Sequence, residues 1–416
     1  MTALGVVTAA RIPSEGYVPL CIGCRLRTLH GSTRPAAVFD EFGKRAMRIV
    51  HVITTINRGG AENHVVDLAL AQADRGADVA IAYLKGDGYW AKRLSTAGVG
   101  VEPLGLKRYG DIAPIVALRR LFRAYAPDLI HAHLPPAELY TRAALLPSGS
   151  RLPLLITKHN DEPFYPGPGH DVVCRWVMQR ACRAIAISDA VNRYSRDQVH
   201  LAGNKLRTVY YGIDCGPFEA VDASARQALH AEWGIKDGEM VIGTVARLVP
   251  QKALHALLTA FSRYKSISQR QPRLVIVGRG PLMAELKDQA ERLALSDSIV
   301  WTGFREDIPA IMQAFDVFSL TSAYEGFGLV LLEAMAASRP VVATAVSAIP
   351  EIVQDGITGV LCPLHDTEAI AAAFLRLEDA NLRAVLGANG LRRVREHFTL
   401  DRVTDATMAV YGECLA

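Results

Sequence analysis

The chain has 416 residues, half of them hydrophobic and about one-fifth charged, which is typical of a globular protein long enough for two domains. No apolar run reaches the ~18 residues that a membrane-spanning helix needs. The formal net charge of +4 comes mostly from residues 1–46, which hold six Lys and Arg against three acidic residues and leave 40 basic and 39 acidic residues in the remainder. Such a balance gives no indication of a nucleic-acid partner.

The seven cysteines show no regular spacing, a pattern typical of reduced thiols in a cytoplasmic protein. Cys21 and Cys24 form a lone C-x-x-C with no second pair or histidine at zinc-ligand spacing, so we expect no metal there. Four other cysteines lie among apolar residues and are predicted to be small core side chains: Cys174, Cys182, Cys215 and Cys362.

Residues 1–46 show no sustained helix or strand period, and Pro13, Pro19 and Pro35 would interrupt any helix. The apolar residues 4–10 follow no charged segment, so a secretion signal is not predicted. A strand pattern begins directly after Met47. We therefore predict that residues 1–46 are a disordered leader or the product of an upstream start site, and that the fold begins at Met47.

From Met47 onward, strand and helix patterns alternate, which indicates an α/β architecture with parallel sheets. The strand candidates of the first series are residues 48–54, 78–84, 128–132, 153–158, 184–188 and 206–211. Helical patterns between them include residues 62–73, 112–126, 136–146 and 189–202.

The segment Asn57-Arg58-Gly59-Gly60-Ala61-Glu62 connects the first strand to an apolar helix. Paired glycines at such a turn leave backbone amides open to an anion or a sugar. A plain tight turn is the alternative. The fingerprint G-x-G-x-x-G is absent, which counts against a nicotinamide enzyme.

Two later strands of this series end in histidines. His131 and His133 alternate along one strand and therefore share a face. His131 is predicted to be a core residue, whereas His133, nearer the carboxyl end, is a candidate for lining a cleft. The segment Thr157-Lys158-His159-Asn160-Asp161 closes the next strand and makes His159 a candidate site residue.

A break at residues 212–217 is followed by a second series, with strands at residues 241–246, 273–277, 298–302, 315–321, 340–344 and 358–362. Two such series predict two doubly wound domains, residues 47–214 and 215–395. Ligands are expected at the carboxyl ends of the strands and in the cleft between the domains. Helical patterns at residues 379–396 and 400–411 complete the chain.

Two cations follow the first strand of the second series, in Ala246-Arg247-Leu248-Val249-Pro250-Gln251-Lys252. The planar fork of Arg247 and the mobile charge of Lys252 together suit a diphosphate. A surface pair of cations is the alternative. Later turns at residues 278–281 and 303–307 also follow strands, and Arg305 in the second of them is another candidate for lining the cleft.

The most informative stretch runs from Glu325 to Glu333 and begins directly after a strand. Gly326 and Gly328 allow a sharp turn, and the amides near Leu329 and Val330 would be unpaired donors at a helix start, where phosphate binds. Glu325 precedes this helix start and Glu333 lies about one turn into the helix, so both can face one ligand. An anion site between two carboxylates suits a nucleotide-sugar, although two solvated surface glutamates are the alternative.

The whole string Glu325-Gly-Phe-Gly-Leu-Val-Leu-Leu-Glu-Ala-Met-Ala336, with Arg339-Pro-Val-Val-Ala-Thr344 after it, resembles the signature of glycosyltransferase family 4, bacterial type. These are retaining enzymes with the GT-B fold, two Rossmann-like domains that face each other across a cleft. The resemblance extends over residues 47–411. It implies that residues 396–416 cross back as a helix onto the first domain.

The resemblance also implies roles for single residues. Glu325 would bind donor sugar hydroxyls, Glu333 the ribose, and His159 the donor sugar near the reaction centre. Arg247 and Lys252 would bind the donor phosphates. The catalytic candidates are thus His159, Arg247, Lys252 and Glu325, and the donor-binding candidates are Gly59, Gly60, Gly326, Phe327, Gly328, Leu329, Val330 and Glu333.

The chain departs from the family pattern at positions where glycine is frequent. Ala246 and Ala253 flank the two cations, Ser338 precedes Pro340, and Ser347 stands in a loop that usually contains two glycines. We expect these added side chains to affect the geometry of the phosphate loop and the choice of donor. The positive charges of Arg247 and Lys252 are kept.

The expected reaction is transfer of a sugar from a nucleoside-diphosphate donor to an acceptor hydroxyl with retention at the anomeric carbon. No D-x-D occurs in the sequence, and we expect neither a metal nor a cofactor. One rival is a nucleotide-sugar 2-epimerase of similar fold, which would change the sugar without an acceptor. Another is a non-catalytic nucleotide-sugar-binding partner subunit, which would not turn the donor over.

The resemblance further implies a sugar or lipid-linked acceptor, a role in cell-surface polysaccharide or glycolipid synthesis, and a cytoplasmic location with peripheral contact at the inner face of the cell membrane. The donor base and sugar, the acceptor, the linkage and the oligomeric state cannot be read from the chain.

Overall fold

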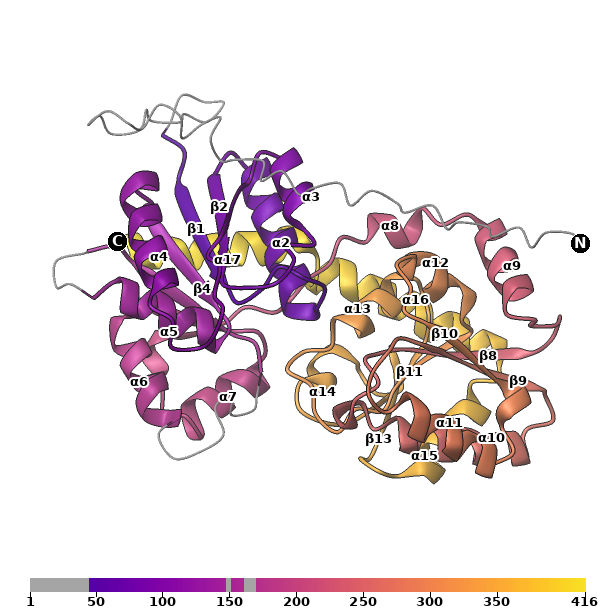
Figure 1. The fold of residues 1–416 in the computed structure, drawn as a ribbon. Coiled ribbons are helices and arrows are strands. Elements are labelled where there is room, and N and C mark those ends of the chain that lie inside the picture. The colour runs from indigo at the N-terminus through magenta and orange to yellow at the C-terminus, as the bar shows by residue number, and fades with distance from the viewer. Residues whose placement is uncertain (1–44, 147–150, 161–169) are drawn as a thin grey trace, which may run out of the picture.

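The computed structural model describes residues 45–146, 151–160 and 170–416 and arranges them as two parallel α/β domains side by side (Figure 1). The first domain contains a seven-stranded sheet of order β3-β2-β1-β4-β5-β6-β7, and the second a six-stranded sheet of order β10-β9-β8-β11-β12-β13. This architecture confirms the predicted fold class of two doubly wound domains.

The strands of the first sheet are β1 Arg48–Ile53, β2 Asp78–Tyr83, β3 Gly100–Pro103, β4 Leu129–His133, β5 Leu154–Lys158, β6 Arg183–Ala186 and β7 Leu206–Thr208. Those of the second are β8 Met240–Val245, β9 Pro272–Val277, β10 Ile299–Gly303, β11 Val317–Leu320, β12 Val341–Thr344 and β13 Gly359–Cys362. Helices cover both faces of parallel sheets, so central strands such as β1 are buried along their whole length and read as continuous apolar runs. Strand β3 was not predicted, because it is a short, partly exposed edge strand that ends in proline.

The helices of the first half are α2 Gly60–Asp74, α3 Ala91–Thr96, α4 Ala113–Tyr125, α5 Pro135–Ala144, α6 His170–Arg180 and α7 Asp189–Asp197. Those that follow are α8 Gly216–Glu219, α9 Ala223–Glu232, α10 Leu254–Ile267, α11 Met283–Arg292, α12 Ile308–Ala314, α13 Leu329–Ala336, α14 Ile349–Ile352, α15 Thr367–Arg376, α16 Ala380–His397 and α17 Leu400–Leu415. The helix predicted over residues 189–202 begins at Asp189, as expected, but ends at Asp197. Ser188 caps its start, because its hydroxyl accepts from the Val191 amide.

The strand order reverses between β1 and β4 in the first sheet and between β8 and β11 in the second. Ligands of doubly wound sheets bind beside such reversals, at the carboxyl ends of the strands. His133 ends β4, and the loops that leave β1, β8 and β11 carry Gly59, Arg247 and Glu325. Topology therefore gathers residues that lie far apart in the sequence.

The chain passes between the domains twice at one place. The Ile213 amide donates to the Phe398 carbonyl at 2.9 Å, and the Leu400 amide donates to the Ile213 carbonyl at 3.0 Å. Gly212 lies so close to the second crossing that a Cβ there would sit 2.5 Å from the carbonyl oxygen of Thr399. From this point α17 runs back behind the first domain, where it packs against α2 (Figure 1).

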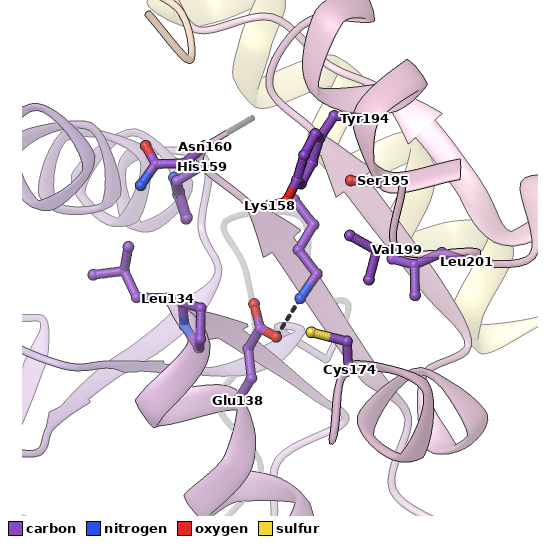
Figure 2. Close-up of a pocket in the computed structure, with 11 residues that line it drawn as sticks. Leu134, Glu138, Lys158, His159, Asn160, Cys174, Tyr194, Ser195, Val199 and Leu201 are labelled. Atoms are coloured by element: carbon purple, nitrogen blue, oxygen red, sulfur yellow. Dashed lines mark hydrogen bonds and ion pairs between the residues drawn. The ribbon is translucent and has the colours of Figure 1, made fainter. Parts of the chain in front are cut away.

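A small cavity lies inside the first domain at the carboxyl ends of β4 and β5 (Figure 2). It is lined by the turn that leads into α5, by residues 158–160 at the end of β5, and by parts of α6 and α7. Its position next to His159 places it beside the residues that the sequence singled out.

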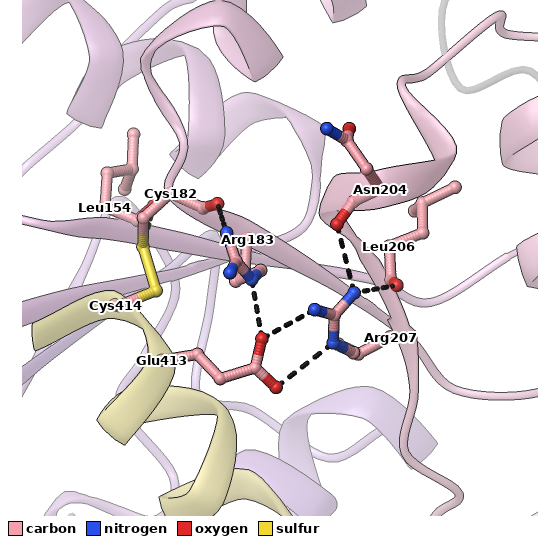
Figure 3. A network of polar contacts seen from close by, with 8 residues as sticks. All are labelled: Leu154, Cys182, Arg183, Asn204, Leu206, Arg207, Glu413 and Cys414. Atoms are coloured by element: carbon pink, nitrogen blue, oxygen red, sulfur yellow. Dashed lines mark hydrogen bonds and ion pairs between the residues drawn. A yellow bond between two sulfur atoms is a disulfide. The ribbon is translucent and has the colours of Figure 1, made fainter. Parts of the chain in front are cut away.

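Cys182 and Cys414 form a disulfide that joins the start of β6 to the end of α17 (Figure 3). The prediction of Cys182 as a reduced core thiol is therefore wrong. The partners are 232 residues apart, and only the return of α17 onto the first sheet brings them together. Glu413, the neighbour of Cys414, adds ion pairs to Arg183 and Arg207, both at 2.7 Å.

The prediction for residues 1–46 lies outside the described residues except for Arg45 and Ala46. Arg45 forms an ion pair with Asp128 at 3.0 Å, and Ala46 is buried. Within the described part of the chain, none of the helices combines the length and the apolar character that crossing a membrane requires.

We expect Cys414→Ser to lower the free energy of unfolding by about 2–4 kcal/mol, because the disulfide closes a long loop and restricts the unfolded chain. Urea denaturation of the wild type and the variant, each with and without reductant, measures this. Reductant should destabilise the wild type and leave the variant unchanged. A wild type with the same unfolding midpoint in both conditions would contradict the disulfide.

Candidate functional site

The two domains touch where the Gly326 turn meets the end of β5. A Cβ on Gly326 would lie 2.4 Å from the carbonyl oxygen of His159, so only glycine allows this approach. The hydroxyl of Ser188 donates to the Gly326 carbonyl at 2.9 Å from the first domain. Gly326 and His159, predicted from separate motifs, thus lie in direct contact across the interface.

Two helix starts face each other beside this contact. Helix α2 begins at Gly60 directly after its N-cap Gly59, and α13 begins at Leu329 after Gly328, which has a left-handed φ of 96°. A Cβ on Gly60 would lie 3.8 Å from Cδ1 of Leu329. Both helix starts present backbone amides with a partial positive charge, so an anion held here is stabilised from two sides.

The predicted cation Lys252 lies against the predicted carboxylate Glu325. Its ammonium group contacts Oε1 of Glu325, which also accepts from the hydroxyl of Ser322 at 2.7 Å. Gln251 ties the same turn to the loop by donating to the carbonyl of Tyr324 at 3.1 Å. The phosphate-binding candidate and the sugar-binding candidate therefore form one buried unit on the second domain.

Arg247 is exposed and lies on the side of the second domain that faces α2. Burial raises the pKa of the Glu62 carboxyl, and the positive charge of Arg247 partly offsets that rise. The cation thus acts electrostatically on the first domain. Arg247 therefore lies near the start of α2, and Lys252 lies beside Glu325 in the loop before α13.

Glu333 is half-buried on α13 and faces Asp67 of α2 across the interface. Burial raises the pKa of Glu333 to about 7, and the negative charge of Asp67 contributes to the rise. Asp67 forms an ion pair with Arg93 at 3.0 Å, although burial still raises its pKa. Glu333 is therefore close to half-protonated near neutral pH.

His159 is buried, and a contact with Tyr211 orients its ring. Its Nδ1 contacts the hydroxyl of Tyr211, whose ring stacks on His64 with 3.9 Å between the ring centroids. Its Nε2 has no hydrogen-bond partner in the part of the chain that the structure describes. Burial lowers the pKa of His159 well below the ordinary value, with the neighbouring charge of His64 adding to the effect. Tyr211 was not predicted as a site residue, because nothing in its local sequence indicates this contact.

The side chain of Phe327 faces the core and not the site. Its ring packs against Tyr211 and Phe398, with 5.5 Å and 6.0 Å between the ring centroids. Only the backbone of Phe327 is available to a donor.

His133 lies beside His159, with 5.5 Å between their ring centroids, and ends a hydrogen-bonded chain of neutral side chains. Gln72 donates to the Tyr411 hydroxyl of α17 at 3.0 Å, so its amide oxygen accepts from Nε2 of His51 at 2.8 Å. Nδ1 of His51 must then accept from Nε2 of His133 at 2.9 Å. This leaves Nδ1 of His133 as an unpartnered acceptor.

His51, His131 and His133 are buried, and their ligand atoms lie within 4.8 Å of one another, close enough to hold a metal ion. However, His131 is held by Tyr411 at 2.8 Å and by Thr157 at 2.6 Å, and both ring nitrogens of His51 are occupied as described above. Burial lowers the pKa of His51 to about 4. The cluster is consistent with neutral, hydrogen-bonded core histidines, as predicted for His131.

Arg305 is held by acidic side chains of the second domain. Its guanidinium binds the carboxylate of Asp307 at 2.6 Å and that of Glu232 at 2.6 Å, both within the second domain. Its donors are therefore engaged, and the geometry does not support its place in the cleft.

Arg58 connects the two domains, although the sequence gave no reason to select it. It forms an ion pair with Glu306 at 2.5 Å and lies over the rings of Tyr89 and Phe304, 4.0 Å and 4.8 Å from their centroids. Its position directly before Gly59 is the only available sequence signal.

Glu351 makes a second connection. Its carboxylate accepts from the amides of Asp189 and Ala190 at 2.8 Å and 2.7 Å, at the start of α7. A carboxylate at a helix start is stabilised by the partial charge of the helix.

Three of the positions where glycine was expected adopt left-handed backbone conformations. Ala253, Ser338 and Ser347 have φ angles of 45°, 56° and 46°. Such angles cost a residue with a side chain roughly 1–2 kcal/mol. The chain therefore keeps the backbone geometry of the family pattern at these positions and accepts the strain.

Two family models match the chain, one for each domain. Residues 58–216 match Glycosyltransferase Family 4, and residues 225–393 match Glycosyl transferases group 1.

Curated relatives and solved structures are also similar to the chain. An alpha-maltose-1-phosphate synthase of Mycolicibacterium smegmatis is 30% identical over 335 residues, which are 72% of this chain and 82% of that protein. A D-inositol 3-phosphate glycosyltransferase of Salinispora arenicola is 35% identical over 247 residues, 55% of this chain and 53% of that protein, so the match spans about half its length. The crystal structure of Anabaena HepE in complex with UDP-glucose matches with a TM-score of 0.78 and 25% identity, covering 88% of this chain and 99% of HepE.

The raised pKa of Glu333 predicts how stability changes with pH. The unfolded group ionises near 4.5 and the folded group near 7, so its contribution is fully present below pH 4.5 and is lost as the pH rises through 7. Glu333→Gln should therefore be more stable than the wild type at pH 8, by at most about 3 kcal/mol, and no more stable at pH 4.5. Urea denaturation at both pH values measures the difference. An equal difference at both values would show that ionisation of Glu333 is not responsible.

Ala253→Gly should raise the free energy of unfolding by about 1 kcal/mol, because glycine adopts the left-handed conformation without steric cost. Chemical denaturation measures the change. The matched control is Ala256→Gly, one turn along in α10, which should lose about 1 kcal/mol. Loss of stability in both variants would refute strain at Ala253.

Proposed function

Since the chain belongs to glycosyltransferase family 4, the retaining glycosyltransferases of group 1 with the GT-B fold, we propose that it transfers a sugar from a nucleoside-diphosphate donor to an acceptor hydroxyl. The observation that carries the proposal is the close approach of two helix starts, at Gly60 and Leu329, with Lys252 held by Glu325 just before one of them and Arg247 near Glu62 of the other. This arrangement suits a diphosphate, the part of the donor that becomes the leaving group.

Departure of the diphosphate builds negative charge, and fixed positive groups aimed at that charge lower the barrier. Lys252, Arg247 and the amides at the start of α13 would all donate hydrogen bonds to the departing diphosphate. The turn that carries Lys252 is tied to the 322–325 loop, so Lys252 is positioned before a donor binds. We assign these residues to binding and stabilisation of the donor phosphates.

Glu325 and His159 are assigned to the donor sugar. Glu325 is buried and linked to Lys252, so a bound diphosphate would share the ammonium group with it while its carboxylate orients sugar hydroxyls. His159 lies against Gly326 with its Nε2 unpartnered, and Tyr211 holds the ring. Retention fits attack from the leaving-group face, with the departing phosphate oxygen taking the proton of the acceptor.

Glu333 is assigned to the ribose of the nucleotide, eight residues after Glu325 and one turn into α13. Gly59, Gly60 and residues 326–330 would contribute backbone amides to the same ligand. The HepE structure is a complex with UDP-glucose, which supports a uridine nucleotide as the first donor to test.

The finer parts of the proposal follow the family resemblance. They are an acceptor in cell-surface polysaccharide or glycolipid synthesis and a cytoplasmic enzyme in peripheral contact with the inner face of the membrane. An observation that supports such contact is the exposure of Tyr109, Ile112 and Val116 near the start of α4, next to the exposed cations Lys107 and Arg108. Apolar side chains ringed by cations suit an anionic lipid surface.

The test begins with a panel of nucleoside-diphosphate sugars, since a ligand that binds only the native state raises the melting temperature. With the donor so found, Arg247→Ala and Lys252→Ala should each lower turnover on the order of 10²-fold or more, as for other groups that stabilise transition-state charge. Release of the nucleoside diphosphate measures turnover.

Lys265→Ala, an exposed lysine of α10, is the control and should keep the wild-type rate. Wild-type rates in both site variants would place the diphosphate elsewhere. Incubation with donor alone separates the rivals, because an epimerase would return a changed nucleotide-sugar and a binding subunit would return the donor intact.

A further inference from the structure

The cavity beside His159 has a volume of about 40 Å³ and lies within the first domain, away from the groups assigned to the diphosphate (Figure 2). By this measure a water molecule needs about 10–15 Å³, so the cavity holds roughly three water-sized groups. His159 and Asn160 are among its lining residues, and His159 is the residue assigned to the donor sugar. A bound sugar could therefore place a short substituent in the cavity, whereas a whole sugar ring is too large for it.

A buried ion pair forms the polar wall of the cavity. Nζ of Lys158 lies 2.5 Å from Oε2 of Glu138, and only 11% and 3% of their side-chain surfaces are exposed. The pair comes from two elements, since Lys158 ends β5 and Glu138 lies in the first turn of α5. Burial of two charges costs free energy that is offset only when their remaining hydrogen-bonding capacity is used.

Part of the hydrogen-bonding capacity of this ion pair has no partner within the described part of the chain. Oε1 of Glu138 is buried and has no hydrogen-bond partner among the residues that the structure describes, and in Figure 2 it is directed into the cavity. Leaving a buried acceptor without a partner is destabilising, which indicates that a ligand group completes it. Within the described ranges, the side chain of Lys158 makes one hydrogen bond, to Glu138, and an ammonium group can donate three.

The chemistry of the pair selects the ligand group. An anion would be repelled by Glu138 and a cation by Lys158, whereas a hydroxyl can donate to the carboxylate and accept from the ammonium group. The opposite wall is apolar and includes Val199 and Leu201, which suits a methylene carbon. A hydroxymethyl group combines both features and fits the volume.

Building on the proposed transferase function, we propose that this cavity is a selectivity pocket that takes the hydroxymethyl arm of a neutral sugar at the reaction centre. Glu138 and Lys158 are its recognition groups. The arm belongs either to the donor sugar or to the acceptor, and the two sources share the same chemistry. A site built to hydrogen-bond a hydroxyl rejects the analogue that lacks it, because its buried polar groups are then left unpaired.

The test compares ligands that differ by the hydroxymethyl group. The donor arm of the experiment measures binding of UDP-glucose and UDP-xylose by calorimetry. The acceptor arm measures UDP release from UDP-glucose with methyl α-D-glucopyranoside or methyl α-D-xylopyranoside. The wild type should prefer the hydroxymethyl compound about 10-fold or more in one arm, and that arm identifies the source.

The main variant is the double substitution Glu138→Gln with Lys158→Met, which removes both charges together and so leaves no unpaired buried ion. It should lose the preference in the same arm while binding UDP as the wild type does. Cys174→Met is a second variant, because it fills the cavity and leaves the ion pair in place. It should weaken the hydroxymethyl ligand and spare the xylose compound. Glu285→Gln, on an exposed side chain of α11, is the matched control and should change nothing.

If the wild type shows no preference in either comparison, the proposal is overturned. It is also overturned if UDP-glucose does not bind. A preference that survives in both cavity variants overturns it as well. A preference in binding that the variants abolish, without UDP release under any condition, would support the pocket and count against the transferase function instead.

Discussion

The structure depends on the absence of one side chain, at Gly326. The backbone there lies against the carbonyl of His159, and a single methyl group at Gly326 would come within 2.4 Å of it. This approach brings the start of α13 to the start of α2 and places Lys252 and Glu325 opposite His159. A phosphate bound between these helix starts would therefore be contacted by both domains.

The charged groups around this contact lie on separate elements, and they include two pairs of opposite charge and one pair of like charge. Lys252 is held by Glu325, Arg247 acts on Glu62, and Glu333 faces Asp67. Arg58 and Glu351 connect the domains at the edges of the interface. A negatively charged ligand would neutralise cations in the centre of the interface, while the pairs at the edges can hold the domains in register.

Below the site, the first domain keeps its histidines neutral. Burial and a directional set of hydrogen bonds that begins at Gln72 leave one open acceptor on His133, beside the unpartnered nitrogen of His159. Tyr411 links this chain to α17, and the disulfide of Cys414 anchors the same helix three residues later. The crossing helix is therefore part of the support of the site as well as a connection between the domains.

The sequence alone determined the alternation of strands and helices, the two-domain architecture and the motifs at the ends of the strands, because apolar periodicity and glycine placement are local properties of the chain. It also indicated the strained positions Ala253, Ser338 and Ser347, since a missing glycine is visible without coordinates. Only the tertiary structure decided which distant residues meet. The contact of Tyr211 with His159, the Glu138–Lys158 pair, the engagement of Arg305 by Glu232 and the disulfide between Cys182 and Cys414 all join separate elements. Partners of this kind are set by the packing of whole elements, and no spacing within the sequence records them.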